Sequence, residues 1–158
     1  MIVVQDTFLS RKEVEFLLKL WDDNNIGFSK NSIRFYAYDL KANNEDIRFI
    51  QNGIFDYSKF QKVRLQKYNE TFDQLENYHE HENIYNYVIF LNENFVGGEL
   101  EFSNGVVVRP RTGTLVYFTN NERHRVRACK GDRYIFTALG DYEADVKLKT
   151  MEKETLEV

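Results

Sequence analysis

The sequence predicts a mainly β fold of the α+β class, in which a sandwich or barrel of strands follows helices in the N-terminal part of the chain. Short β-branched and aromatic runs recur from Gln61 onward, about every eight to twelve residues, with turn residues between them. Evenly spaced strands of this kind are typical of sandwiches and barrels, and not of sheets in which strands alternate with helices. The ten Tyr and thirteen Phe, against one Pro and eight Gly, also favour strands.

Chain length bounds the domain organisation. The 158 residues, of which 42% are hydrophobic, are enough for one domain with a substantial core and too few for two. We therefore expect a single domain over residues 1–158. Its parts are an N-terminal flank at 1–60, a strand core at 61–140 and a C-terminal tail at 141–158.

Charge and composition exclude several kinds of partner. The net charge of −4 gives no basic field, so we expect no binding to nucleic acid or to an anionic membrane surface. Cys129 is the one cysteine, which rules out an internal disulfide, and the N-terminal residues lack the pattern of a signal peptide. No window reaches the ~18 apolar residues of a membrane span. A cytoplasmic protein is the expectation.

The N-terminal flank contains a clear helix signal. Ser10 and Glu13 form the sequence pattern of a capping box, because the serine can accept from the first turn while the glutamate reaches back. Apolar residues then recur at helical spacing, which predicts a helix from about Arg11 to Asp23.

The rest of the flank gives weaker signals. The alternating run SIRFYAYD predicts a strand at 32–39. A second, weaker helix is expected at 44–55, followed by an aromatic loop around Tyr57 and Phe60. These elements are expected beside the core rather than in it.

Seven runs predict the strands of the core, and turn residues separate them. Asn104-Gly105 marks the clearest hairpin, because both residues tolerate the positive φ that a type I′ turn needs. The charged segment 147–158 is expected to fray or to form a surface helix. The core strands are expected at 62–68, 85–91, 98–102, 106–110, 114–118, 124–128 and 133–139.

The histidines suggest a metal site. On an extended chain His79 and His81 point to one face while Glu80 and Glu82 point to the other, so two imidazoles are placed as a chelate. His124, the third and last histidine, opens another predicted strand and could complete the site. Three nitrogen ligands leave the opposite side of a metal open for chemistry. The alternative is a polar surface row, which two histidines at this spacing often form.

The order of four core segments resembles a known family. Tyr68 ends a strand eleven residues before His79, and the strand VIFLN follows. The later segments are Gly97-Gly98-Glu99-Leu100-Glu101-Phe102, then Gly113, Leu115 and Phe118, then His124, Val126, Gly131 and Arg133. Over Val63 to Leu139 this arrangement resembles the iron(II)- and 2-oxoglutarate-dependent dioxygenases, in particular the prolyl 4-hydroxylase-like branch. The segment FLSRKEVEFLLKLW resembles the helix that usually precedes their catalytic core.

This resemblance implies a double-stranded β-helix, the jelly roll of cupin-like proteins, and it implies Fe(II), 2-oxoglutarate and O2 as cofactors. The expected metal ligands are His79, His81 and His124. The expected cofactor-binding residues are Tyr68, Val126 and Arg133. Together with the three histidines, Arg133 would form the catalytic group, because a guanidinium fork matches the far carboxylate of 2-oxoglutarate. Taken alone, Arg133 could equally be an exposed strand arginine, and Tyr68 a core tyrosine.

One position departs from the family pattern. The family motif is His-x-Asp, or occasionally His-x-Glu, whereas this chain reads His79-Glu80-His81, with His81-Glu82-Asn83 as the other register. Neither register supplies the carboxylate. A local bulge could bring Glu80 or Glu82 to the metal instead. Three-histidine iron sites resemble those of the cupin-type thiol dioxygenases, but the glutamate of the cupin pattern has no clear counterpart here.

Three functions are compatible with these residues. The first is a hydroxylase that acts on a C–H bond of a protein, a peptide (prolyl among them) or a small molecule and converts 2-oxoglutarate to succinate. The second is an inactive jelly-roll binding module, which would bind a small dicarboxylate through Tyr68 and Arg133. It could instead bind a peptide or sugar at an aromatic mouth, expected at Phe55, Tyr57, Phe60, Tyr85 and Tyr87. The third is a cupin-like three-histidine oxygenase that does not use 2-oxoglutarate. Substrate specificity is expected in residues 40–60 and the turn at 120–123, and Glu99 and Glu101 are assigned no chemistry.

Overall fold

The computed structural model describes residues 1–24, 36–40, 60–68 and 78–144. Its main element is a six-stranded sheet in which every neighbouring pair is antiparallel. In spatial order the strands are β1 (Ile2–Gln5), β8 (Leu115–Thr119), β4 (Tyr85–Phe90), β11 (Arg133–Gly140), β3 (Phe60–Tyr68) and β2 (Tyr36–Asp39).

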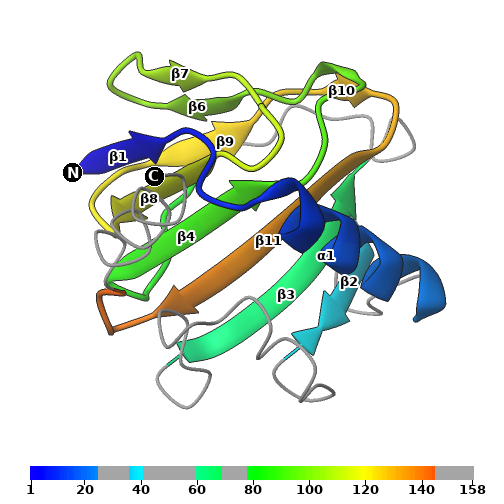
Figure 1. The fold of residues 1–158 in the computed structure, drawn as a ribbon. Coiled ribbons are helices and arrows are strands. Elements are labelled where there is room, and N and C mark those ends of the chain that lie inside the picture. Colours follow the sequence, from blue (N-terminus) through cyan, green and yellow to red (C-terminus); the bar gives the residue numbers. More distant parts are fainter. Residues whose placement is uncertain (25–35, 41–59, 69–77, 145–158) are drawn as a thin grey trace, which may run out of the picture.

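A smaller sheet packs on one face of the large one. It consists of β7 (Val107–Val108), β6 (Leu100–Phe102) and β9 (His124–Val126), and a further pair is formed by β5 (Val96–Gly97) and β10 (Cys129–Lys130). Figure 1 shows β6, β7 and β9 above the large sheet. A cluster of buried residues from both sheets, among them Phe102 and Phe118, joins the two layers. Two antiparallel sheets packed face to face confirm the mainly β, jelly-roll prediction.

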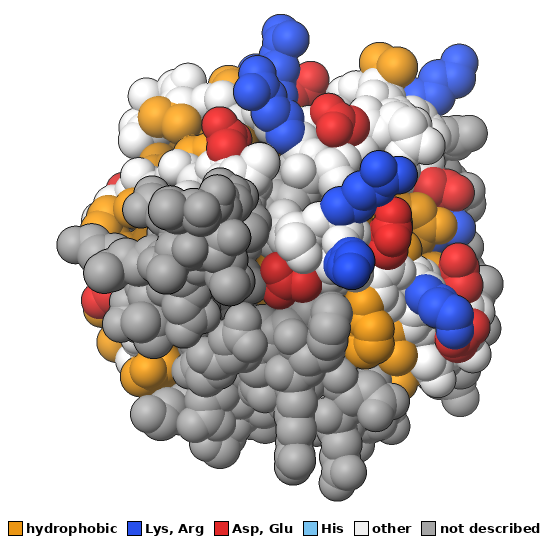
Figure 2. Space-filling model, in the orientation of Figure 1, with side chains coloured by type: hydrophobic (Ala, Val, Ile, Leu, Met, Phe, Trp, Pro, Cys, Tyr) orange, Lys and Arg blue, Asp and Glu red, His pale blue; other side chains and the backbone are white. Residues whose placement is uncertain are grey.

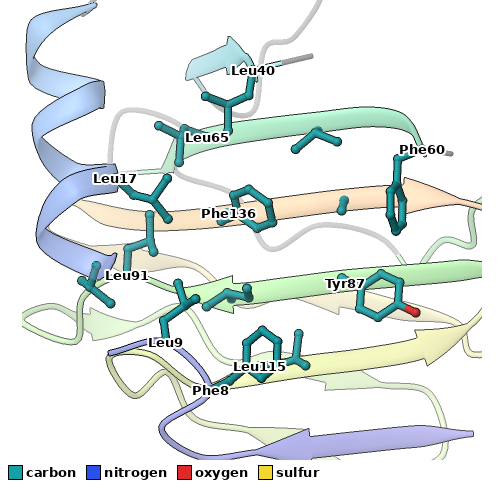
Figure 3. Close-up of a cluster of buried hydrophobic side chains, with 14 of the residues drawn as sticks. Phe8, Leu9, Leu17, Leu40, Phe60, Leu65, Tyr87, Leu91, Leu115 and Phe136 are labelled. Atoms are coloured by element: carbon teal, nitrogen blue, oxygen red, sulfur yellow. The ribbon is translucent and has the colours of Figure 1, made fainter. Parts of the chain in front are cut away.

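Helix α1 (Arg11–Asp23) covers the other face of the large sheet. It begins as the sequence predicts: the Glu13 N–H donates to Ser10 Oγ at 3.2 Å, and the Ser10 N–H donates to Glu13 Oε1 at 3.0 Å. Figure 3 shows Leu17 extending from α1 into the cluster that contains Leu65 and Phe136. Burial of one such leucine stabilises the fold by about 1.5–3 kcal/mol, so this amphipathic face is what holds the helix on the sheet.

Strand alternation gives the large sheet two chemically different faces. Val63 and Leu65 of β3 belong to the cluster under α1. The alternate residues of β3 line a cavity on the opposite face, as successive side chains of a strand must point in opposite directions. They are Lys62, Arg64, Gln66 and Tyr68. One face of the sheet is therefore a dry core, and the other is available for a functional site.

The hairpin between β6 and β7 forms as predicted, but its turn differs. Gly105 has a φ of +95°, whereas Asn104 keeps a negative φ. The Gly105 N–H donates to the Phe102 carbonyl at 3.0 Å, so the loop has three residues and ends on a glycine in the left-handed region. The type I′ prediction is wrong, because Asn104 instead accepts the Val106 N–H through its side chain at 3.1 Å.

The other predictions have mixed outcomes. The core strands and α1 lie where the sequence places them, but β1, β5 and β10 were not predicted. Phe60 begins β3 and is not part of a loop. Residues 32–35, the helix expected at 44–55, Tyr57 and the tail from 147 lie outside the described residues. Among the described residues, no helix has the length and apolar character needed to cross a membrane.

Candidate metal centre

The three histidines come together at one end of the cavity. His79 and His124 form an isolated antiparallel bridge, with reciprocal N–H···O bonds of 2.9 Å, so their side chains lie side by side. The ring centroids of His79 and His81 are 5.1 Å apart, and each lies within 5 Å of the His124 ring centroid, at 4.3 and 4.9 Å. The potential ligand atoms of all three lie within 4.8 Å of one another. The convergence expected from the sequence is therefore present.

His124 is held in the form that a metal ligand requires. It is 4% exposed, and its Nδ1 lies 3.0 Å from the Glu122 carbonyl oxygen. A carbonyl only accepts, so Nδ1 carries the proton and Nε2 presents its lone pair. That Nε2 lies 3.1 Å from Nε2 of His81. The imidazoles thus point their free nitrogens at a common position.

Burial keeps these imidazoles neutral. Removal from water lowers the pKa of His124 to about 4, and the neighbouring His79 and His81 act in the same direction. Burial also lowers the pKa of His81 to about 4, with further contributions from His79 and Lys62. A neutral imidazole is the form that binds a metal. His81 and His124 therefore do not have to release a proton to solvent before a metal binds at neutral pH.

Arg133 lies in the same cavity. Its side chain is fully buried, its Nε donates to the Gly98 carbonyl at 2.9 Å, and its guanidinium carbon lies 5.1 Å from the Tyr68 ring centroid and 5.4 Å from that of Phe90. Arg133 and Tyr68 are directly opposite each other in the β11–β3 register. Both side chains therefore point into the cavity from neighbouring strands.

Gly98 makes room for this arginine. Its φ is +71°, and a Cβ at this position would lie 2.8 Å from Arg133 Cδ. In the sequence, Gly98 is evident only as part of a glycine pair that matches the family pattern. The sequence signal that could have revealed its role is the Gly97-Gly98 pair itself, because glycine tolerates positive φ and permits close approach of a neighbouring side chain.

The cavity has a volume of about 220 Å³ and opens between the two sheets. Its walls include the three histidines, Tyr68, Arg133 and Val126. Among the described residues that line it, none is Asp or Glu, whereas Lys62, Arg64 and Arg133 are cations. The cavity therefore favours an anionic ligand.

Within the described part of the chain, no carboxylate joins the histidines. Glu80 and Glu82 are both exposed, and neither belongs to the cluster of potential ligands. The bulge that would have turned one of them inward is not observed. The donors that the described residues supply at this site are three imidazoles, which suit Fe(II) as well as Zn, Cu and Ni.

The predicted aromatic mouth is wrong for the residues that the structure describes. Phe60 and Tyr87 are buried, at 1% and 0% exposure, in the cluster under α1, and Tyr85 packs against the same cluster. They point away from the cavity because alternation places them on the opposite face of the sheet. Phe55 and Tyr57 lie outside the described residues.

An ionic cluster on the smaller sheet supports the histidine strands. Glu101 accepts the Tyr78 hydroxyl at 2.7 Å and the Arg127 Nε at 2.9 Å, and it also pairs with Arg125 at 3.3 Å. Arg125 lies 4.0 Å from the Tyr78 ring centroid. These contacts lower the pKa of Glu101 to about 2, Arg127 first and then Tyr78 and Arg125. Because Tyr78 precedes His79 and Arg125 follows His124, the cluster fixes the backbone beside both histidines, a role that was not predicted from the sequence.

Comparison with protein families gives a clear match. The model of the 2OG-Fe(II) oxygenase superfamily matches residues 57–139, which is more than half of the chain and includes all three histidines and Arg133. No curated protein sequence matches the chain.

Solved structures share the fold at low sequence identity. The viral collagen prolyl hydroxylase of Paramecium bursaria Chlorella virus-1, in its 2OG complex, is 18% identical, with a TM-score of 0.67 and coverage of 87% of this chain and 94% of that one. A prolyl-4-hydroxylase of Pseudomonas putida is 20% identical, with a TM-score of 0.61 and coverage of 89% and 92%. A Trichoplax adhaerens prolyl hydroxylase, in complex with a hypoxia inducible factor peptide fragment, is 15% identical, with a TM-score of 0.67 and coverage of 95% and 86%.

Proposed function

The chain belongs to the 2OG-Fe(II) oxygenase superfamily, and from this premise we propose that it is an Fe(II)- and 2-oxoglutarate-dependent hydroxylase of the prolyl 4-hydroxylase-like branch. The observation that carries the proposal is the placement of three convergent imidazoles and a buried guanidinium in one cavity, whose described lining residues include no carboxylate. The substrate is a C–H bond of a peptide, with prolyl peptides first to test, or of a small molecule.

Each cavity residue has a distinct task under this proposal. His79, His81 and His124 would hold Fe(II), and Arg133 would bind the far carboxylate of 2-oxoglutarate through its planar fork. Tyr68, opposite Arg133, would add a phenolic hydrogen bond. When bound, iron with 2-oxoglutarate and O2 supplies the oxidising chemistry that yields succinate, CO2 and a hydroxylated substrate.

The protein itself contributes orientation and exclusion of water. The Glu122 carbonyl fixes the His124 ring, and Gly98 holds the Arg133 side chain by its carbonyl oxygen. Apolar walls, including Val126 and Phe118, keep bulk water from the reacting atoms and strengthen the attraction between Arg133 and a carboxylate.

Anaerobic titration of the protein with Fe(II) and then 2-oxoglutarate tests the proposal. A weak visible charge-transfer band is expected when the diacid chelates the iron, followed by succinate release when O2 is admitted. Iron that is demonstrably bound, with no such band, would contradict the proposal. A module that binds without catalysis releases no succinate.

The three-imidazole donor set favours one competing function, a cupin-like oxygenase that does not use 2-oxoglutarate. The two functions differ in what they require of Arg133. An Arg133→Ala protein keeps its oxygen consumption under the cupin-like function and loses it under the proposed one. If the Arg133→Ala protein also loses the charge-transfer band, its loss of oxygen consumption results from failure to bind 2-oxoglutarate.

A further inference from the structure

Two cations occupy successive cavity-facing positions of β3. Lys62 is exposed at the mouth and Arg64 is half-buried, and both line the cavity. Within the part of the chain that the structure describes, neither forms an ion pair. Asp39 lies opposite Arg64 in the β2–β3 register, but it is exposed and does not line the cavity.

The strand register places Lys62 at the level of the histidines. Lys62 is opposite Leu139, Leu139 is opposite Asn86, and Asn86 is opposite Phe118. The Phe118 ring centroid lies 4.6 Å from that of His124. This row crosses the floor of the cavity from the cation to the metal centre.

The 2-oxoglutarate site does not account for these cations. Tyr68, opposite Arg133, is six positions along β3 from Lys62 and four from Arg64, which corresponds to about 20 Å and about 13 Å at about 3.3 Å per residue. A five-carbon diacid held by Arg133 at one carboxylate and by the metal at the other has no third anionic group to offer Lys62 or Arg64.

The positive charge is also local to the cavity. The chain as a whole carries a net charge of −4. Figure 2 shows Lys and Arg interspersed with Asp and Glu over the described part of the face that it draws. A cation pair inside a cavity with apolar walls attracts an anion more strongly than the same pair on open surface.

We propose that Lys62 and Arg64 form a second anion site, which binds a carboxylate of the substrate and so holds a neighbouring C–H bond at the metal centre. This inference deepens the proposed hydroxylase function and rests on it. The substrate class is a carboxylate-bearing molecule, either a small free acid or an acidic segment of a peptide.

Calorimetric titration of the full chain, loaded with Mn(II) and 2-oxoglutarate under nitrogen, tests the site without turnover. The peptide probes are a short acetylated peptide with proline flanked by Glu and its counterpart flanked by Gln. The small-molecule probes are N-acetylglutamate and N-acetylglutamine. The variants are Lys62→Ala/Arg64→Ala and, as a control with the same loss of charge at exposed positions outside the cavity, Arg109→Ala/Arg111→Ala.

An acidic probe is expected to bind the wild type and the control about tenfold more tightly than its amide counterpart, and the double variant is expected to lose this preference. Whether the peptide or the free acid shows the preference identifies the source of the carboxylate. Lys62→Ala alone, which changes only an exposed side chain, should lose part of the preference with the fold intact.

Equal binding of acid and amide by the wild type overturns the inference. So does a preference that survives in the double variant, or a wild type that binds neither acidic probe. The charge-transfer band of the Fe(II) protein, recorded separately, reports on the hydroxylase proposal. A missing band with an intact acid preference contradicts that proposal and leaves the anion site standing.

Discussion

Arg133 is a fully buried cation in largely apolar and aromatic surroundings. The rings of Tyr68 and Phe90 face its guanidinium, and the Gly98 carbonyl accepts from its Nε. Burial of a charge is unfavourable unless hydrogen bonds and an opposite charge accompany it. Under the proposed function a bound dicarboxylate would supply that opposite charge, so the residue is expected to be sensitive even to a conservative replacement.

Arg133→Lys is expected to weaken 2-oxoglutarate binding by at least about a hundredfold, because lysine keeps the charge and loses the planar fork. The charge-transfer band in anaerobic titrations measures this affinity. Binding of Fe(II) alone should be unchanged, since the histidines remain. A variant that titrates with 2-oxoglutarate like the wild type contradicts the role of Arg133.

His81 and His124 make the stability of the metal-free protein depend on pH. Burial lowers the pKa of both to about 4, whereas each titrates near 6.5 in the unfolded chain. Between these values the unfolded chain binds more protons than the folded one. The free energy of unfolding is therefore highest above about pH 6.5 and falls as the pH drops toward 4.

Urea unfolding at pH 7 and pH 5, with a chelator present, measures that fall. A His81→Gln/His124→Gln protein should lose less stability over the same interval, because its glutamines do not titrate. An equal loss in both proteins would show that the histidines are not responsible.

Single residues were predicted unevenly from the sequence. The three histidines, Tyr68 and Arg133 could be named, because their spacing matches a known pattern. The contribution of Glu101 could not, because it depends on Tyr78 and Arg127 arriving from distant segments. Strand alternation indicates which face a residue lies on, but not which partner it meets there.

Strand β6 and its approach segment position the site through backbone geometry. Gly98 and Gly105 flank β6, and both have positive φ, at +71° and +95°. They differ in the space around them: a Cβ at Gly98 would meet the Arg133 side chain at 2.8 Å, and a Cβ at Gly105 would meet nothing within 4 Å.

Gly105→Ala is expected to cost about 1 kcal/mol of stability, from backbone strain alone. Gly98→Ala should cost more and should also weaken 2-oxoglutarate binding, because Arg133 has to move. Urea unfolding and the charge-transfer titration measure the two effects. If the Gly98→Ala and Gly105→Ala proteins bind 2-oxoglutarate with similar affinity, Gly98 does not position Arg133 through its missing Cβ.

The pairing of β6 with β9 also carries the Glu101 cluster. Glu101→Gln is expected to weaken metal binding by about tenfold, because residues that orient metal ligands typically contribute 10- to 100-fold. Competition with a chelator measures the metal affinity. Glu99→Gln, on the same segment, is the control and should leave that affinity unchanged. A Glu101→Gln protein that binds the metal as tightly as the wild type would contradict the role of Glu101 in positioning the histidines.

At the level of elements, local signals were reliable and non-local ones were not. The capping box gave the start of α1 and the polar run at 22–25 gave its end, while alternation gave β3, β4, β8 and β11. Strand β1 was missed because its only described partner, β8, is more than 100 residues away in sequence. The two-residue strands β5 and β10 are too short for periodicity to detect.

The molecule as a whole is a pair of sheets with a dry core on one side of the larger sheet and the site on the other. The cavity lies between the layers, so a ligand bound there contacts both. Ligands that bind only the folded state stabilise it by mass action. Metal and diacid should therefore tie the two sheets together.

At concentrations about 100-fold above its Kd, each ligand should add about 2.7 kcal/mol, which for a chain of this size corresponds to a rise in Tm of about 5 to 10 °C. Thermal unfolding with and without metal, and with 2-oxoglutarate added last, measures each step. Chelation should reverse both shifts. A diacid shift that persists without metal would contradict joint binding.

The overall fold was predictable because period-two alternation and turn spacing recur along the whole core. The departure of the His79-Glu80-His81 motif from the family's His-x-Asp pattern was also visible in the sequence. The shared position of Lys62 and Arg64 was not predicted, because only the three-dimensional pairing of the strands reveals that both line the cavity that contains the histidines.

Trp21 is the only tryptophan of the chain, and it lies 4% exposed where α1 meets the sheet. Its ring packs edge-on against Tyr134, with centroids 5.9 Å apart, and Tyr134 is the immediate neighbour of Arg133. The native protein thus carries an intrinsic fluorophore beside the strand that contributes Arg133 to the cavity. Its emission will shift to the red when the helix detaches, so that this motion can be followed without any label.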